Sequence, residues 1–277
     1  MNGRSPVACT LLIIALFVLS AGCTSAPAQQ TATVPVTVTA SPAEATFTGH
    51  TGTAARSIAE QLAAVKSDNP VWTAAYAMFS NMKSTEYVHP PYTVDEANGT
   101  YRFDCLGFAD HVLMNADMAA YTAIGRGANP SIETYAAYFN KLSTTTPDAA
   151  GWTKVAHPVD LAPGDVCLWL KPSTLDSGHM WIIAETPSVN PKRTDEVLVR
   201  IFDSTGTVHS DDSRTGAADK TGLGSGILGM MVDTDGNPAG LYWEGGASTG
   251  AGEKDTTIVC GRLKLIKKVF RLFSGTL

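Results

Sequence analysis

The sequence predicts an α+β fold in which N-terminal helices pack on an antiparallel β-sheet. Several segments between residues 55 and 142 carry apolar side chains at helical spacing, whereas short runs rich in β-branched and aromatic residues dominate after Ala162. Helices that come first and strands that follow favour an antiparallel sheet, because parallel sheets arise from strands and helices in alternation. Residues 55–277 have the length of one domain.

Four helices are expected in the first half of this domain. They cover residues 55–66, 70–83, a segment that begins near Cys105, and 130–142. Pro130 suits the first turn of the last of them. Residues 84–102 contain a proline pair and an Asn-Gly turn, and this segment is expected to be irregular.

Six strands are expected after Ala162, each bounded by glycine, proline or aspartate. Residues 186–195 form a loop between the second and the third. Residues 233–244 carry acidic side chains at calcium-loop spacing, but Pro238 stands where the loop needs glycine, so a hairpin turn at Asp235-Gly236 is the better interpretation. The expected strands are 165–171, 179–185, 196–203, 226–233, 239–243 and 256–263.

The N-terminus has the features of an export signal. Arg4 gives a positive start, an apolar run follows over residues 11–19, and small residues lead to Cys23. This order resembles the lipobox of prokaryotic lipoproteins, which implies a signal peptide over residues 1–22 and a lipid on Cys23. An uncleaved membrane anchor and a plain secretory signal are the alternatives.

The segments on either side of the domain differ in composition. Residues 23–54 are rich in threonine, alanine and proline, so they are expected to form an extended tether. Residues 262–273 combine basic and apolar side chains; a last strand or a docking helix is favoured over a helix lying on an anionic membrane. The net charge of −6 offers no general basic surface, so no nucleic-acid partner is expected.

Cysteine usage singles out one thiol. Cys9 would leave with the signal peptide and Cys23 would be lipidated, which leaves an odd number outside the cytoplasm. Cys105 follows Asp104, a good N-cap residue, so it should lie in the first turn of a helix, where the helix dipole favours thiolate. Gly107 would leave space there for a substrate. The other two, which could be inert or could pair, are Cys167 and Cys260.

A nucleophilic thiol needs a base and a group that orients it. His179 stands at the start of an expected strand, and Asp203 stands at the end of the next one. An imidazole between a thiol and a carboxylate takes the proton from sulfur and returns it to the leaving group. Asp203 could instead be a plain turn residue, and Asp195 and Glu196 are alternatives for its role.

Three segments resemble motifs of the NlpC/P60 cysteine peptidases, a papain-like family. They are DCLGF (104–108), LAPGDVCLWL (161–170) and GHMWIIAE (178–185). The resemblance implies a papain-like fold with Cys105 as nucleophile and His179 as base. It also implies a tyrosine near the nucleophile, here Tyr87, that would help to hold the oxyanion. Leu106 stands where the family usually has serine, and residues after 205 lie outside the resemblance.

The sequence therefore predicts an extracytoplasmic, membrane-anchored thiol hydrolase that cleaves amide bonds. The family implies a peptide or amide substrate at the cell envelope, with cell-wall peptides as its substrate class, and a lipid anchor in the membrane. No metal or other cofactor is expected. A catalytically inactive surface-binding domain of the same fold and a thioester acyltransferase are the alternatives.

Overall fold

The structure is a computed structural model, and it describes residues 56–125, 129–171, 178–216, 220–247, 252–254 and 256–264. These residues belong to one compact unit, Ala54–Leu277. The expected signal peptide (1–22), Cys23 and the tether (23–54) lie outside the described residues. Within the described ranges, no helix is both long and apolar enough to cross a membrane.

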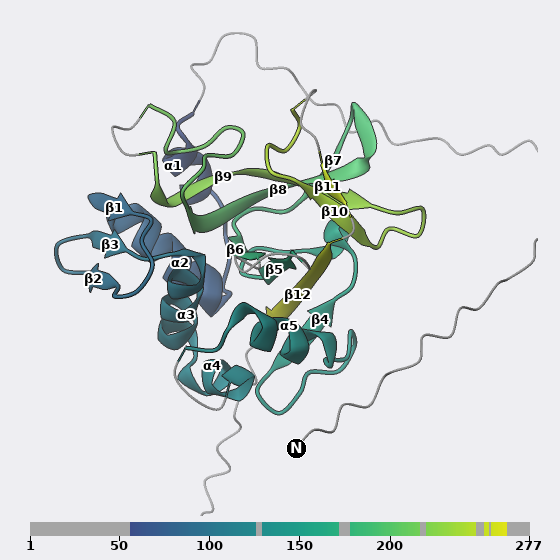
Figure 1. The fold of residues 1–277 in the computed structure, drawn as a ribbon, viewed down its shortest axis with the longest axis horizontal. Helices are drawn as coiled ribbons and strands as arrows, with labels where there is room; N and C mark the ends of the chain where they lie inside the picture. Colours follow the sequence, from purple (N-terminus) through teal and green to yellow (C-terminus); the bar gives the residue numbers. More distant parts are fainter. Residues whose placement is uncertain are drawn as a thin grey trace, which may run out of the picture. The chain divides into compact units, whose positions relative to one another are not determined.

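The α-helices that the structure describes all lie in the first half of the unit (Figure 1). The helix expected at Cys105 begins at that residue, and the predicted helix 70–83 ends at Asn81. The placement of Pro130 in a first turn is wrong: Ser131 caps the helix by accepting a hydrogen bond from the Thr134 N–H, so Pro130 precedes it. The helices are α1 (Ile58–Ala63), α2 (Pro70–Asn81), α3 (Cys105–Ala116), α4 (Met118–Gly125), which the sequence did not predict, and α5 (Ile132–Asn140).

The second half of the unit is a large antiparallel sheet, as predicted. Its strand order is β11-β10-β9-β8-β6-β5-β12-β4, and β7 pairs with β8. β10 also contacts β12, although four strands lie between them in this order, so the sheet curls round on itself. The strands are β4 (Trp152–Val155), β5 (Val166–Leu170), β6 (Gly178–Ile183), β7 (Ser188–Asn190), β8 (Arg193–Thr205), β9 (Gly222–Val232), β10 (Pro238–Tyr242), β11 (Glu253–Lys254) and β12 (Thr257–Leu263); a short 3₁₀ turn, Pro158–Asp160, precedes β5.

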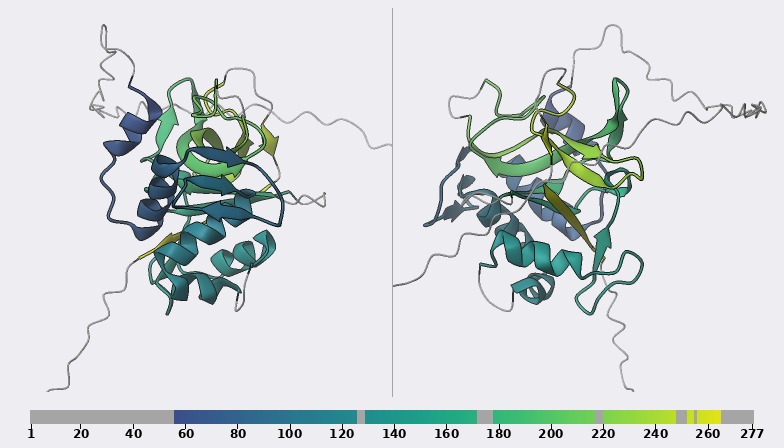
Figure 2. Two further views of the ribbon diagram at one scale, coloured as in Figure 1. Left: turned by 90° about the vertical axis from the view of Figure 1, so that its left-hand side faces the viewer. Right: turned by 45° about the vertical axis from the view of Figure 1, so that its right-hand side comes forward.

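Two segments expected to be irregular contain strands. Residues 84–102 form a small sheet of β1 (Ser84–Glu86), β2 (Thr93–Asp95) and β3 (Thr100–Arg102), onto which the left view of Figure 2 looks. Each of these strands has three residues, too few to show alternation in the sequence. Residues 186–195 hold β7 and the start of β8. Of the C-terminal segment 262–273, β12 includes Arg262 and Leu263, and residues 265–273 lie outside the described residues.

Side chains that alternate along the sheet build two apolar layers. On β6, Met180 and Ile182 pack with the helices, whereas Trp181 and Ile183 pack on the opposite face. Fully burying one such aliphatic side chain contributes about 1.5–3 kcal/mol. α3 contacts both β6 and β8, so its N-terminal residue lies near the strands that carry His179 and Asp203.

Candidate active site

Cys105 is the first residue of α3, and Asp104 fixes this start. The Asp104 Oδ1 accepts hydrogen bonds from the Gly107 N–H (2.8 Å) and from the Tyr92 hydroxyl (2.7 Å). Its Oδ2 lies 3.2 Å from Nδ1 of His89. The N-cap predicted from the sequence is therefore present, and it is itself held by two side chains from the segment before it.

The Cys105 thiol is buried, with 8% of the residue exposed. Burial raises its pKa to about 12, although the Met180 N–H, which points at the sulfur, lowers it. A rise of this size corresponds to about 4 kcal/mol against the thiolate, whereas a helix N-terminus contributes about 0.3–1 kcal/mol in exposed cases. The expectation of a thiolate is therefore wrong for this arrangement, in which Cys105 is a neutral thiol.

The space beside Cys105 is also filled. A Cβ added at Gly107 would lie 2.6 Å from the ring of Tyr92. Gly107 therefore makes room for Tyr92 rather than for a substrate, contrary to expectation. Tyr92 is a site residue that sequence reasoning missed, because it stands in the segment 84–102 that was interpreted only as irregular.

His179 is the second residue of β6. The glycine before it is needed because a Cβ at Gly178 would lie 1.9 Å from the Trp169 carbonyl oxygen on β5. The imidazole packs against the rings of Trp181 and Trp243, with centroid distances of 6.0 and 5.0 Å. Burial lowers the pKa of His179 and outweighs the opposing effect of Asp203.

The structure brings His179 and Asp203 together. The His179 Nε2 lies 2.7 Å from Oδ2 of Asp203, which is fully buried on β8. Burial alone would raise the pKa of Asp203, but Arg214 and His209 lower it well below its usual range. Since an ionised carboxylate only accepts hydrogen bonds, Nε2 of His179 is the donor, and the lone pair of the neutral ring is on Nδ1.

A buried network around Asp203 is completed by three residues from the chain that follows β8, namely His209, Asp212 and Arg214. His209 Nε2 lies 2.9 Å from Oδ2 of Asp203, and Arg214 donates to its Oδ1 at 3.0 Å. Arg214 also donates to both oxygens of Asp212. Sequence reasoning missed these residues because the family resemblance that assigned the site ends at residue 205; the charged run HSDDSR (209–214), shortly after a buried strand, was the available signal.

The spacing of His179, Asp203 and His209 would by itself suit a divalent cation, because their ligand atoms lie within 4.8 Å of one another. The charges of the surrounding residues do not fit a divalent cation. Both Asp203 oxygens already accept hydrogen bonds, and the guanidinium of Arg214 is buried beside them. A metal ion would add positive charge next to this cation, so we interpret the group as a hydrogen-bonded charge network.

Cys105 and His179 lie on different faces of the sheet. Cys105 belongs to the apolar layer of the helices, whereas the His179 ring packs with the tryptophans of the other layer. The hydrogen bonds between these described residues include none from the Cys105 sulfur to the imidazole. Cys105 is linked to His179 through the backbone: the Met180 N–H points at the sulfur, and this N–H belongs to the peptide bond that joins His179 to Met180.

Tyr87 is half-buried, and its ring lies edge-on to His89 at 5.5 Å. Its backbone N–H donates to Thr221 Oγ1 at 3.4 Å. The tyrosine hydroxyl seen at the start of α3 is that of Tyr92. The oxyanion role assigned to Tyr87 stays a prediction.

The two alternatives to Asp203 lie elsewhere. Glu196 is buried and paired with Arg193, and its other oxygen accepts the Gly246 N–H. Asp195 is exposed. Asp203, by contrast, contacts His179.

Cys167 and Cys260 form a disulfide between neighbouring residues of β5 and β12. Among the cysteines that the structure describes, Cys105 is therefore the free one. This settles the pairing that the sequence left open.

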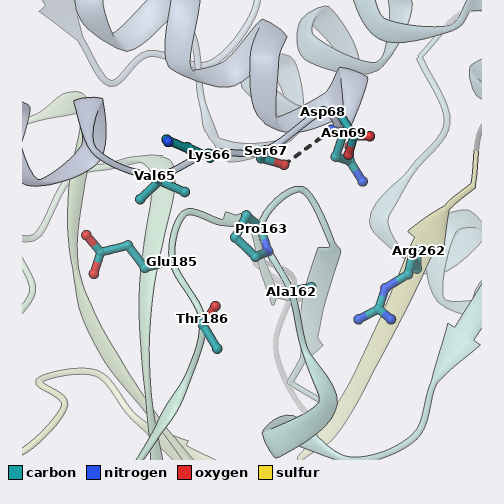
Figure 3. A pocket seen from close by; sticks show the side chains of 10 residues that line it. All are labelled: Val65, Lys66, Ser67, Asp68, Asn69, Ala162, Pro163, Glu185, Thr186 and Arg262. Carbon is teal, nitrogen blue, oxygen red and sulfur yellow. Dashed lines mark hydrogen bonds between the residues drawn. The ribbon is translucent and has the colours of Figure 1, made fainter.

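A pocket of about 670 Å³ lies away from these residues (Figure 3). It is lined by the connection between α1 and α2 (65–69), by Ala162 and Pro163, and by Glu185, Thr186 and Arg262. Cys105, His179 and Asp203 do not line it. The pocket therefore has no part in the chemistry of these three residues.

Comparison of the chain with protein-family models, with curated proteins and with solved structures gave no match. The resemblance to NlpC/P60 peptidases thus rests on the three motifs alone and stays a prediction.

Proposed function

We propose that this protein is a thiol hydrolase of papain-like fold that cleaves amide bonds with Cys105, His179 and Asp203. One observation carries the proposal: His179 is held by Asp203 at 2.7 Å through Nε2, while the following peptide N–H touches the Cys105 sulfur. The bond to Asp203 fixes the ring and gives Nδ1 the lone pair. A base held in one tautomer by a carboxylate is one of the parts that catalysis by a thiol requires.

The neutral state of both groups suggests how the reaction begins. The Cys105 sulfur attacks the carbonyl carbon of the substrate as its proton passes to Nδ1 of His179. The imidazolium then returns that proton to the leaving amine, and the acyl group remains on sulfur as a thioester. Water, deprotonated by His179, attacks the thioester and releases the acid and the thiol.

The substrate and the place of action are part of the proposal. The motifs resemble those of a family whose members act on cell-wall peptides, and the N-terminal segment resembles a lipoprotein signal. We accordingly propose a peptide or amide substrate at the cell envelope and a lipid on Cys23 that anchors the protein extracytoplasmically.

One observation favours a second candidate, a catalytically inactive surface-binding domain. The Cys105 thiol is 8% exposed and its pKa is raised to about 12. A small buried thiol of this kind often has only a packing role.

Labelling with a thiol-directed probe separates the two candidates. The purified protein is treated without reductant, so that the Cys167–Cys260 disulfide stays closed, and the labelled peptide is identified by mass spectrometry. We expect label on Cys105, with a rate at least tenfold lower in His179→Ala. His111→Ala is the matched control, because this histidine lies on α3 and contacts Glu96 instead. Equal rates in both variants would favour the binding domain.

A further inference from the structure

We propose that His209 is a positioning residue of this site, a permanent imidazolium that holds the Asp203 carboxylate for His179 and offsets its charge. The inference rests on the proposed function of Cys105 and His179. It assigns a role to a residue outside the three sequence motifs.

The hydrogen bonds of His209 determine its protonation. Nδ1 lies 2.8 Å from the carbonyl oxygen of Trp243, and Nε2 lies 2.9 Å from Oδ2 of Asp203. A carbonyl and a carboxylate both accept only, so each ring nitrogen must carry a hydrogen. The ring is fully buried, so water cannot take the place of either partner. His209 is therefore doubly protonated and positively charged.

The charges around His209 balance. Asp203 on β8 faces its ring, and the Asp212 Oδ2 accepts its backbone N–H at 2.8 Å. Arg214 bridges these two carboxylates, and His179 of β6 is the other ionisable group that contacts Asp203. Two cations thus match two anions before His179 takes a proton. The pKa of His209 follows the same balance: burial alone would lower it, but the attraction of Asp203 raises it.

This balance has a consequence for His179. Its Nε2 and the Nε2 of His209 share one oxygen of Asp203, so the carboxylate is already compensated by His209 and Arg214. A proton on His179 would add a third cation to the network. His209 therefore helps to keep His179 neutral, with the lone pair of Nδ1 ready for the thiol proton.

His209→Gln tests this role, because an amide N–H can still donate to Asp203 but carries no charge. Without the charge of His209, the Asp203 carboxylate is free to stabilise a cation on His179, so the pKa of His179 should rise. A general base must be unprotonated, and its activity is lost as pH falls through its pKa. The acid limb of Cys105 labelling should therefore move to higher pH in the variant. His157→Gln is the control, because His157 also contacts a backbone carbonyl, that of Gly236.

The readout is ¹⁵N NMR of the histidine rings in the full chain, together with the pH profile of labelling. In the wild type we expect both nitrogens of His209 to be protonated at pH 7. A neutral His209, or an unchanged titration of His179 in His209→Gln that only lowers the melting temperature, would overturn the inference. If the variant does not fold, the wild-type spectrum alone still decides the protonation of His209. Absence of Cys105 labelling in the wild type would count against the proposed function, while the spectra would still report on His209.

Discussion

The Ser204 hydroxyl donates a 2.8 Å hydrogen bond to the carbonyl oxygen of Phe103. Ser204 follows Asp203 on β8, and Phe103 stands two residues before Cys105. The bond therefore joins the strand that carries the orienting carboxylate to the chain that leads into α3. Together with the Met180 N–H at the Cys105 sulfur, it fixes the position of the thiol relative to β6 and β8.

Replacement of Ser204 by alanine should weaken this junction. Ser204 is fully buried, and a neutral buried hydrogen bond of this kind contributes about 0.5–1.5 kcal/mol. We expect the free energy of unfolding, measured by urea titration, to fall by that amount. Ser80→Ala, which removes an exposed serine on α2, should change it by less than about 0.5 kcal/mol. A loss no larger than that of Ser80→Ala would show that the bond adds nothing to stability.

The disulfide should contribute more than any single hydrogen bond. Cys167 and Cys260 are separated by 93 residues in the sequence, so their bond restricts a long loop of the unfolded chain. Removing a native disulfide from a small secreted domain typically costs about 2–5 kcal/mol. We expect a loss in this range for the Cys167→Ala, Cys260→Ala double variant. Dithiothreitol should destabilise the wild type to a similar degree and leave the double variant unchanged; an equal effect on both would contradict the pairing.

Asp110 should make stability depend on pH. It is buried on α3 and accepts a 2.5 Å hydrogen bond from the Tyr135 hydroxyl. Burial raises the pKa of Asp110 to about 6, although Tyr135 and Tyr121 lower it. The pKa of Asp110 is higher in the folded state than in the unfolded chain. The contribution of Asp110 to stability is therefore complete below about pH 4 and is lost as pH rises through about 6.

Asp110→Asn isolates this contribution, because the amide keeps an acceptor for Tyr135 and cannot ionise. The free energy of unfolding of the variant, relative to that of the wild type, should rise by about 3 kcal/mol from pH 4 to pH 7. Urea unfolding at several pH values measures the difference. Asp195→Asn, at an exposed position, should follow the wild type. If the curve of Asp110→Asn also runs parallel to the wild type, Asp110 does not titrate in this range.

The elements that sequence reasoning predicted are those with long apolar patterns or strong caps. Asp104 marks the start of α3, and the run of β-branched and aromatic residues in 179–185 marks β6, whose bounds differ from the predicted strand by at most two residues. α4 was missed because Asp117 alone separates it from α3, and no glycine or proline marks the boundary. The small sheet was missed because its strands have three residues each, and because β1 pairs with β3, which lies beyond β2 in the chain.

The sequence predicts those site residues whose chemical type and expected place in the fold both suit the proposed chemistry. Asp203 stands at the end of a strand next to the one that carries His179, and such neighbours can be inferred from order alone. The burial of Cys105 could not be inferred, because it depends on Tyr92 and on how α3 packs against β6. The partners of Asp203 beyond His179 come from a loop that folds back on β9, which only the tertiary structure defines.

The carboxylate of Asp203 should be needed for the fold as well as for turnover. Asparagine offers one acceptor oxygen, but His179, His209 and Arg214 all donate to the carboxylate. In either orientation the new amide N–H₂ would face a donor. Breaking a buried charge network by removing one partner costs about 3–5 kcal/mol, so Asp203→Asn should be destabilised by this amount. Asp233→Asn, in an exposed turn, should lose less than about 0.5 kcal/mol.

A second substitution separates this network from a plain turn role for Asp203. In the double variant Asp203→Asn, Arg214→Gln, the glutamine oxygen can accept from the new amide, and the excess positive charge that Asp203→Asn leaves beside Asp212 is gone. The double variant should therefore be more stable than the sum of the two single losses implies, with a coupling of about 1–3 kcal/mol in a double-mutant cycle. A turn residue would show no coupling to Arg214, and its replacement would leave the labelling rate of Cys105 per folded molecule unchanged. Chemical unfolding and labelling of the same four proteins therefore decide between the two roles.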